Sequence, residues 1–179
     1  MTNRSDGIRN MVVSALFLAV AYVLPNFTGN IPQIGSMLLP MHLPTILCGF
    51  LCGTPWGAAV GFFAPLMRSA ILGMPYMYPT AIAMAFEMAV YGFVSGFLYH
   101  RLSKTPRGVY AALIGAMVCG RIVWGVVMSV LLVGSGGFTS AAFIAGAFTN
   151  AIPGIILQLV AIPAIVLSLQ KANLVSRAV

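Results

Sequence analysis

Residues 80–100 read TAIAMAFEMAVYGFVSGFLYH, an apolar run that contains a single acidic residue, Glu87. A helix of about 20 mostly apolar residues is long enough to cross the hydrocarbon core of a bilayer. An ionised side chain at the centre of such a helix costs roughly 2.5–3.5 kcal/mol on insertion scales. The default reason for accepting that cost is a polar site for a small solute.

The whole chain has the composition of an integral membrane protein. Of its 179 residues, 60% are hydrophobic and 6% are charged, whereas soluble domains are about a quarter charged. The first apolar run is expected to be an uncleaved span and not a signal peptide. We therefore predict an all-α membrane protein, in which residues 1–179 form a single six-helix domain with spans at about 11–25, 37–53, 57–73, 80–100, 109–133 and 140–170.

The basic residues predict how the chain lies in the membrane. The formal net charge is +7, but the lysines and arginines form no stripe with interleaved aromatic residues, so we expect no nucleic-acid partner. Outside the spans they lie near the N-terminus, in the loop at 101–108 and after the last span. These three places fall on one side of the membrane, and the positive-inside rule makes both termini cytoplasmic.

Polar residues within the spans are expected to share the outer half of the membrane. With a rise of about 1.5 Å per residue, Arg68 and Glu87 lie roughly 8–10 Å below the outer ends of their helices, and Arg121 and Asn150 roughly 15–18 Å. His42 is shallower, whereas Gln158 is expected to lie too deep to touch an external solute. The predicted substrate-binding residues are His42, Arg68, Glu87, Arg121 and Asn150, with Tyr76 and Tyr78 of a proline-rich external connection covering the ligand.

The charges within this group predict the charge of the solute. Two arginines against one glutamate leave an excess of +1, which favours a carboxylate held by the guanidinium groups. The alternatives are structural: Glu87 pairs with one arginine only to fix helix register, His42 is a hydrogen-bonded packing residue, and Asn150 has no contact with a ligand.

Small residues and cysteines indicate how the helices pack. Gly49, Gly53, Gly57 and Gly61 recur at every fourth position, a spacing that lets helix backbones approach closely in lipid. Cys48 and Cys52 are expected to be free thiols between helices, with a metal site as the weaker alternative. We predict no metal and no cofactor.

Four segments resemble one family of membrane proteins. They are Leu39-Pro-Met-His-Leu-Pro-Thr-Ile-Leu-Cys-Gly49, Ala64-Pro-Leu-Met-Arg-Ser69, Ala83-Met-Ala-Phe-Glu-Met-Ala-Val-Tyr-Gly92 and, in the first span, Ala15-Leu-Phe-Leu-Ala19. Together with the length, the six spans and the basic charge, they resemble the substrate-binding S components of energy-coupling factor (ECF) vitamin importers.

The resemblance implies a function and a set of partners. An S component of the bacterial plasma membrane binds a vitamin from outside, topples in the bilayer and releases it inward, together with a membrane scaffold (T) subunit and two ATPases. The Ala-xxx-Ala pair of the family falls on Ala15 and Ala19, which the resemblance assigns to contact with the scaffold. The chain itself has no G-x-x-x-x-G-K-[ST] phosphate loop for ATP.

The identity of the solute and two other classes of protein stay open. The excess positive charge makes pantothenate the first candidate, and pyridoxine or a related B6 form the second, since Glu87 can accept hydrogen bonds from its hydroxyls. A stand-alone secondary transporter would use Glu87 to bind a proton, although no pair of related halves is visible. An intramembrane enzyme would need a catalytic constellation, and His42 with Glu87 is the only pairing that the sequence offers for one.

Overall fold

The computed structural model describes residues 4–28, 37–102, 104–133, 139–147 and 149–172. All regular structure in these ranges is helical. The α-helices are α1 (Arg4–Val23), α3 (His42–Cys52), α4 (Thr54–Leu72), α5 (Ile82–Arg101), α6 (Pro106–Leu131), α7 (Ser140–Ala147) and α8 (Ile152–Lys171). Three short turns of other helix types join them: η1 (Leu24–Thr28), η2 (Met77–Ala81) and η3 (Thr149–Ala151).

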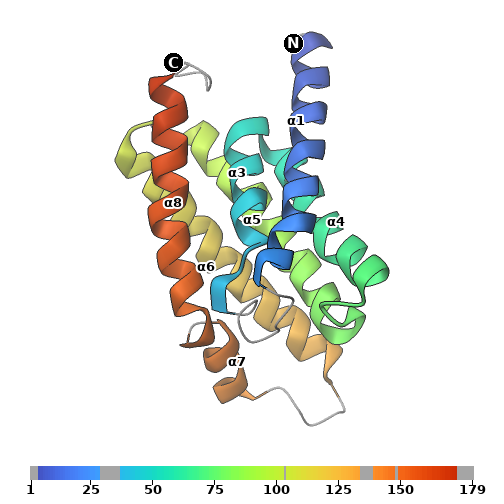
Figure 1. The fold of residues 1–179 in the computed structure, drawn as a ribbon. Coiled ribbons are helices and arrows are strands. Elements are labelled where there is room, and N and C mark those ends of the chain that lie inside the picture. The colour runs from blue at the N-terminus through green and yellow to red at the C-terminus, as the bar shows by residue number, and fades with distance from the viewer. Residues whose placement is uncertain (1–3, 29–36, 103, 134–138, 148, 173–179) are drawn as a thin grey trace.

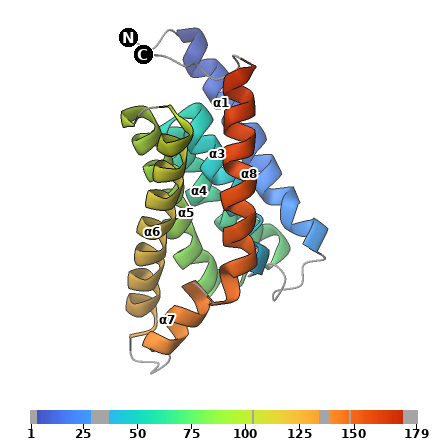
Figure 2. The same ribbon diagram turned by 90° about the vertical axis from the view of Figure 1, so that its left-hand side faces the viewer.

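The helices form one bundle whose two ends are different. The start of α1, the end of α8 and the connection between α5 and α6 lie at one end (Figures 1 and 2). We call this the terminal end. The connection between α4 and α5 lies at the other end, as does α7, and we call this the connection end (Figure 1). The predicted external connection before α5 therefore lies at the end opposite the start of α1.

Four helical stretches of the described residues are long and apolar enough to cross a membrane. They are Asp6–Phe27, Met77–Arg101, Pro106–Leu131 and Ala141–Lys171. The α3 helix is apolar but has only 11 residues, and α4 has 19 with Arg68 among them. The multi-pass membrane class is thus supported, with two of the six predicted spans shorter or more polar than the rest.

The second span begins later than predicted. Its helix starts at His42 and not at residue 37, because Leu39 has a left-handed φ of 50° and is followed by Pro40, which disfavours helical geometry in the residue before it. The helix ends at Gly53, whose φ of 92° is accessible to glycine at little cost. This places His42 in the first turn of α3.

The sixth span is broken, contrary to the prediction of one helix over 140–170. The chain forms α7, passes through η3 and starts a new helix, α8, at Ile152. Pro153 lies in the first turn of α8, where a missing backbone N–H does no harm, whereas inside a longer helix it would remove a hydrogen bond. The break occurs at the connection end, below the rest of the bundle (Figure 2).

Glycines allow three helices to meet at the centre of the bundle. A Cβ atom on Gly57 of α4 would lie 2.6 Å from the Cα of Gly49 in α3 and 2.7 Å from the carbonyl oxygen of Gly92 in α5. Such contacts are closer than any side chain permits. The predicted packing of the second helix against the third is confirmed, and α5 joins it.

Two hydrogen bonds, one helical turn apart on α1, attach this helix to the last turns of α3. The Cys48 thiol donates to the Ser14 hydroxyl at 3.5 Å, and the Asn10 amide donates to the carbonyl of Cys52 at 3.4 Å. The opposite face of α1 carries exposed apolar side chains such as Leu16 and Val20. In a bilayer that face is available to lipid or to another helix.

Candidate functional site

An ion pair between α5 and α6 forms the centre of the site. The Nη1 atom of Arg121 lies 2.8 Å from Oε1 of Glu87, and both side chains are almost completely buried. Glu87 lies in the second turn of α5, close to the connection end, whereas Arg121 reaches it from deeper in α6. The attraction between two charges is strong in surroundings of low dielectric constant. Removing either charge would leave the other buried and without a partner.

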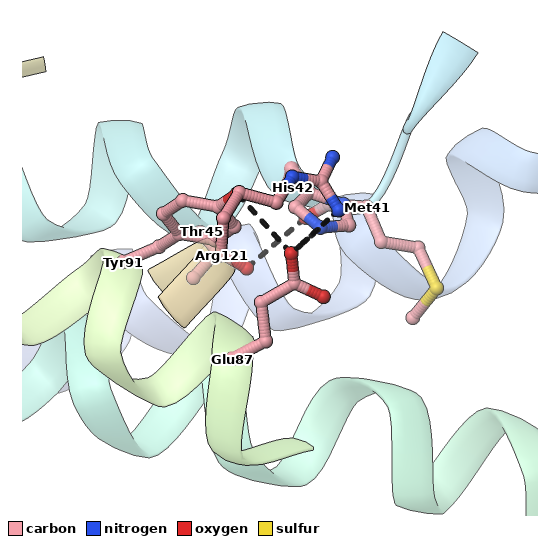
Figure 3. Close-up of polar contacts among 6 residues, drawn as sticks. All are labelled: Met41, His42, Thr45, Glu87, Tyr91 and Arg121. Atoms are coloured by element: carbon pink, nitrogen blue, oxygen red, sulfur yellow. Dashed lines mark hydrogen bonds and ion pairs between the residues drawn. The ribbon is translucent and has the colours of Figure 1, made fainter. Parts of the chain in front are cut away.

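His42 and Tyr91 complete the surroundings of the Glu87 carboxylate. Nε2 of His42 lies 3.6 Å from Oε1 of Glu87, and the Tyr91 hydroxyl donates to the same oxygen at 3.1 Å. The rings of His42 and Tyr91 meet edge to face, with centroids 5.2 Å apart. Figure 3 shows these side chains converging on Glu87 from three helices. We call these four residues the Glu87 cluster.

The sequence explains why these side chains meet. Tyr91 follows Glu87 by four residues, which places both on the same face of α5. His42 opens α3 because the turn at Leu39 and Pro40 ends just before it, and Thr45 ties the first turn by donating to the Met41 carbonyl at 3.0 Å. The α5 helix packs against both α3 and α6, so the three helices deliver their polar residues to one point.

Several buried polar atoms of the bundle, three of them in the Glu87 cluster, have no hydrogen-bond partner. Among the residues that the structure describes, they are Nδ1 and Nε2 of His42, Nη2 of Arg121 and Nε2 of Gln158. A buried donor or acceptor without a partner costs roughly 1–3 kcal/mol. Native proteins leave few such groups, and each requires an explanation. One explanation is that a bound ligand supplies the missing hydrogen-bond partners.

A comparison with protein families supplies the class of protein. A family model for the substrate-specific component of ECF transporters matches residues 9–166. The chain belongs to this family. No match was found among curated proteins or among solved structures. The chain is therefore an ECF S component, a substrate-binding subunit of a transporter in the plasma membrane, and the family implies association with a scaffold, with ATPases and with a small-molecule substrate.

In this S component Arg68 and Arg121 have different surroundings. Arg68 is buried, and its guanidinium donates to the Tyr22 carbonyl at 2.6 Å and to Oδ1 of Asn26 at 3.0 Å. It also lies over the Tyr22 ring, 5.9 Å from the centroid. These contacts join α4 to the end of α1 and to η1, whereas Arg121 is the arginine that pairs with Glu87. The prediction of an excess charge of +1 beside Glu87 assumed that both arginines lie next to it. Of the two arginines, the structure pairs only Arg121 with Glu87.

The remaining predicted site residues lie toward the connection end. Asn150 is exposed in η3, not buried at mid-membrane, because the break before α8 removes the continuous helix on which its depth was based. Tyr76 and Tyr78 are also exposed, and the Tyr78 hydroxyl donates to the carbonyl of Leu131 at the end of α6. That bond ties the connection before α5 to α6.

Gln158 is a buried polar residue whose predicted depth was counted from a helix start at residue 140. If the sixth helix began at residue 140, Gln158 would be eighteen residues deep, but α8 begins at Ile152 and Gln158 is in its second turn. A Cβ on Gly154 would lie 2.6 Å from the carbonyl oxygen of Met37, so the start of α8 lies beside the residues that precede α3. Gln158 follows Gly154 by one helical turn. Pro153, in the first turn of α8, was the available signal for a new helix start.

Proposed function

We propose that this S component binds a small water-soluble vitamin, or a vitamin precursor, at the Glu87 cluster. The observation that carries the proposal is the set of buried atoms without partners around a buried ion pair, in a chain that belongs to a family of substrate-specific components. A structural ion pair alone does not require unsatisfied donors beside it. A polar solute supplies their partners.

The proposal includes a direction of transport. The solute enters from outside through the connection end, Arg121 and Glu87 hold it, and the connections that carry Tyr76, Tyr78 and Asn150 close over it. Both termini lie in the cytoplasm, in agreement with the basic residues at the terminal end. The scaffold subunit docks on α1 beside Ala15 and Ala19, and two ATPases supply the energy for release.

Two vitamins are the candidates for the solute. Pantothenate is a monocarboxylate with hydroxyl and amide groups, and Arg121 could hold its carboxylate. Pyridoxine or another unphosphorylated B6 form carries no net negative charge, and its hydroxyls can donate to Glu87. The case for pantothenate is weaker with one arginine beside Glu87 than with two.

Mass spectrometry of the small molecule that co-purifies with the chain tests the proposal directly. Arg121→Ala should weaken binding of that molecule by more than about tenfold, because truncating a buried charged partner typically costs 2–5 kcal/mol or more. In proteoliposomes, uptake should require the scaffold and the ATPases. Uptake by the chain alone that a protonophore abolishes would instead identify a secondary transporter.

A further inference from the structure

The buried ion pair at the centre of the Glu87 cluster has no net charge. Arg121 contributes one positive charge and Glu87 one negative charge at 2.8 Å, while Tyr91 is bound to Glu87 through its hydroxyl and is uncharged at neutral pH. A ligand with a net charge would therefore add an unbalanced charge to a site inside a membrane protein, which is strongly unfavourable.

Atoms that lack partners are mainly hydrogen-bond donors. Nη2 of Arg121 and Nε2 of Gln158 can only donate, and the imidazole of His42 offers at least one donor. The Glu87 carboxylate already accepts from Arg121 and Tyr91 on Oε1. A ligand that satisfies these protein donors must present more hydrogen-bond acceptors than donors.

Gln158 brings one of these donors from a fourth helix. The side chain is 1% exposed, and α8 packs against α3 and α6, the helices that carry His42 and Arg121. Gln158 follows Gly154 by one helical turn, and Gly154 packs against Met37 and Leu38, which precede α3. A glutamine amide buried among membrane helices with an unpaired N–H group is costly unless something accepts from it.

We propose that the site selects an uncharged, acceptor-rich small molecule, and that Gln158 is one of the residues that determine this specificity. Carbonyl, ring-nitrogen or hydroxyl oxygen acceptors of the ligand bind Nη2 of Arg121 and Nε2 of Gln158, and His42 makes one further contact. The inference rests on the proposed function, because it assigns the substrate class of the same site. It favours a pyridoxine-like molecule over pantothenate.

Pairs of molecules that differ only in one charge test the substrate class. Pantothenate and its alcohol analogue panthenol form one pair, and nicotinate and nicotinamide form another; pyridoxine is measured beside them. Binding to the full chain in lipid nanodiscs is followed by calorimetry at pH 7.5, with any co-purified ligand removed first and its own charge determined. Sites that require a particular hydrogen bond discriminate strongly against an analogue that cannot make it.

The neutral member of any pair that binds should bind at least tenfold more tightly, and the co-purified molecule should carry no net charge. A tighter anionic member, or a co-purified carboxylate or phosphate, would overturn the substrate class while leaving the S component function intact. If the wild-type chain retains no molecule, binds none of these probes and supports no uptake with its partners, the proposed function fails and this inference fails with it.

Two glutamines of α8 provide a matched pair of variants for the role of Gln158. Gln158→Leu removes the unpaired donor, whereas Gln170→Leu removes a glutamine that already donates to the Tyr99 hydroxyl at 2.6 Å. Gln158→Leu should weaken binding of the co-purified ligand at least tenfold, and Gln170→Leu should change it less than twofold. Equal effects on binding would overturn the assignment.

Thermal unfolding of the ligand-free variants separates a specificity residue from a structural one. Replacing an unsatisfied buried amide by an apolar side chain of similar shape is neutral or stabilising, whereas breaking a satisfied hydrogen bond is destabilising. The midpoint should therefore stay the same or rise for Gln158→Leu and fall for Gln170→Leu. A fall for Gln158→Leu as large as that for Gln170→Leu would make Gln158 a packing residue.

Discussion

Oε1 of Glu87 accepts from Nη1 of Arg121 at 2.8 Å and from the Tyr91 hydroxyl at 3.1 Å, all within the buried interface of α5 and α6. One carboxylate oxygen thus joins two helices and fixes the side chain that a ligand would meet. The ion pair has a structural role in addition to the proposed binding role, and the two roles can be separated by experiment.

Glu87→Gln and Arg121→Gln should each destabilise the chain more than the double variant does. Removing one partner of a buried ion pair leaves the other charge uncompensated, which typically costs 3–5 kcal/mol, whereas removing both leaves two neutral amides that can bond to each other. Thermal unfolding of the two single variants and the double variant in detergent measures the coupling. Losses that simply add in the double variant would show that the two side chains are energetically independent.

Arg68→Ala should lower stability without changing the charge preference of the site. The variant loses charged hydrogen bonds to the Tyr22 carbonyl and to Asn26, and each hydrogen bond of this kind contributes roughly 1.5–3 kcal/mol. Affinity should fall for neutral and anionic probes by the same factor, because Arg68 acts through the position of η1.

Asn26→Ala is the matched variant for Arg68, since it removes one of the same hydrogen bonds and leaves the charge in place. Its effect should have the same sign as that of Arg68→Ala and be smaller. If Arg68→Ala instead shifts the preference between panthenol and pantothenate, Arg68 contacts the ligand, as the charge count in the sequence predicted.

Gly57→Ala should be strongly destabilising, whereas Gly7→Ala should not. A Cβ on Gly57 would lie 2.6 Å from the Cα of Gly49, but a Cβ on Gly7 of α1 has no atom within 4 Å. Overpacking of this kind costs about 1–3 kcal/mol, and an exposed helical glycine replaced by alanine gains roughly 0.5–1 kcal/mol. Thermal unfolding gives the comparison, and similar midpoints for both variants would contradict the close packing of α3, α4 and α5.

The fold was largely predictable because the bilayer imposes strong rules on composition. Apolar runs, breakers and basic loops located the helices, and glycine spacing located the tightest packing. The break before α8 was missed because Pro153 and Asn150 are compatible both with a kinked span and with a new helix start. Tertiary packing of the α8 start beside Met37 decides between them, and a sequence pattern does not contain that contact.

The grouping of Glu87, Arg121 and His42 was predictable from the sequence, whereas the positions of the other candidate residues were less so. Glu87, Arg121 and His42 could be grouped because polar residues in apolar helices tend to face one another. Depth along a helix says nothing about direction around it, so Arg68 seemed equivalent to Arg121 although it binds the end of α1. Tyr91 could have been found from its spacing of four from Glu87, whereas Gln158 needed the true start of α8.

Ala15→Trp and Ala19→Trp should leave ligand binding intact and block transport. Both alanines are exposed on α1, beside apolar side chains such as Leu16, and small residues one turn apart let a second helix approach closely in lipid. An indole at either position would hold the scaffold helix away from α1, while the Glu87 cluster, formed by α3, α5 and α6, would not change. Binding is measured with the chain alone, and uptake with the reconstituted complex.

Ala111→Trp is the control for this prediction. Ala111 is an exposed alanine on α6, which packs against α5 and α8, so the same indole is added to a different face of the bundle. Uptake should fall at least tenfold for the two α1 variants and remain near wild type for Ala111→Trp. Normal uptake with Ala15→Trp and Ala19→Trp would remove α1 as the docking face, and an equal loss with Ala111→Trp would mean that any exposed tryptophan disturbs the movement of the bundle in the membrane.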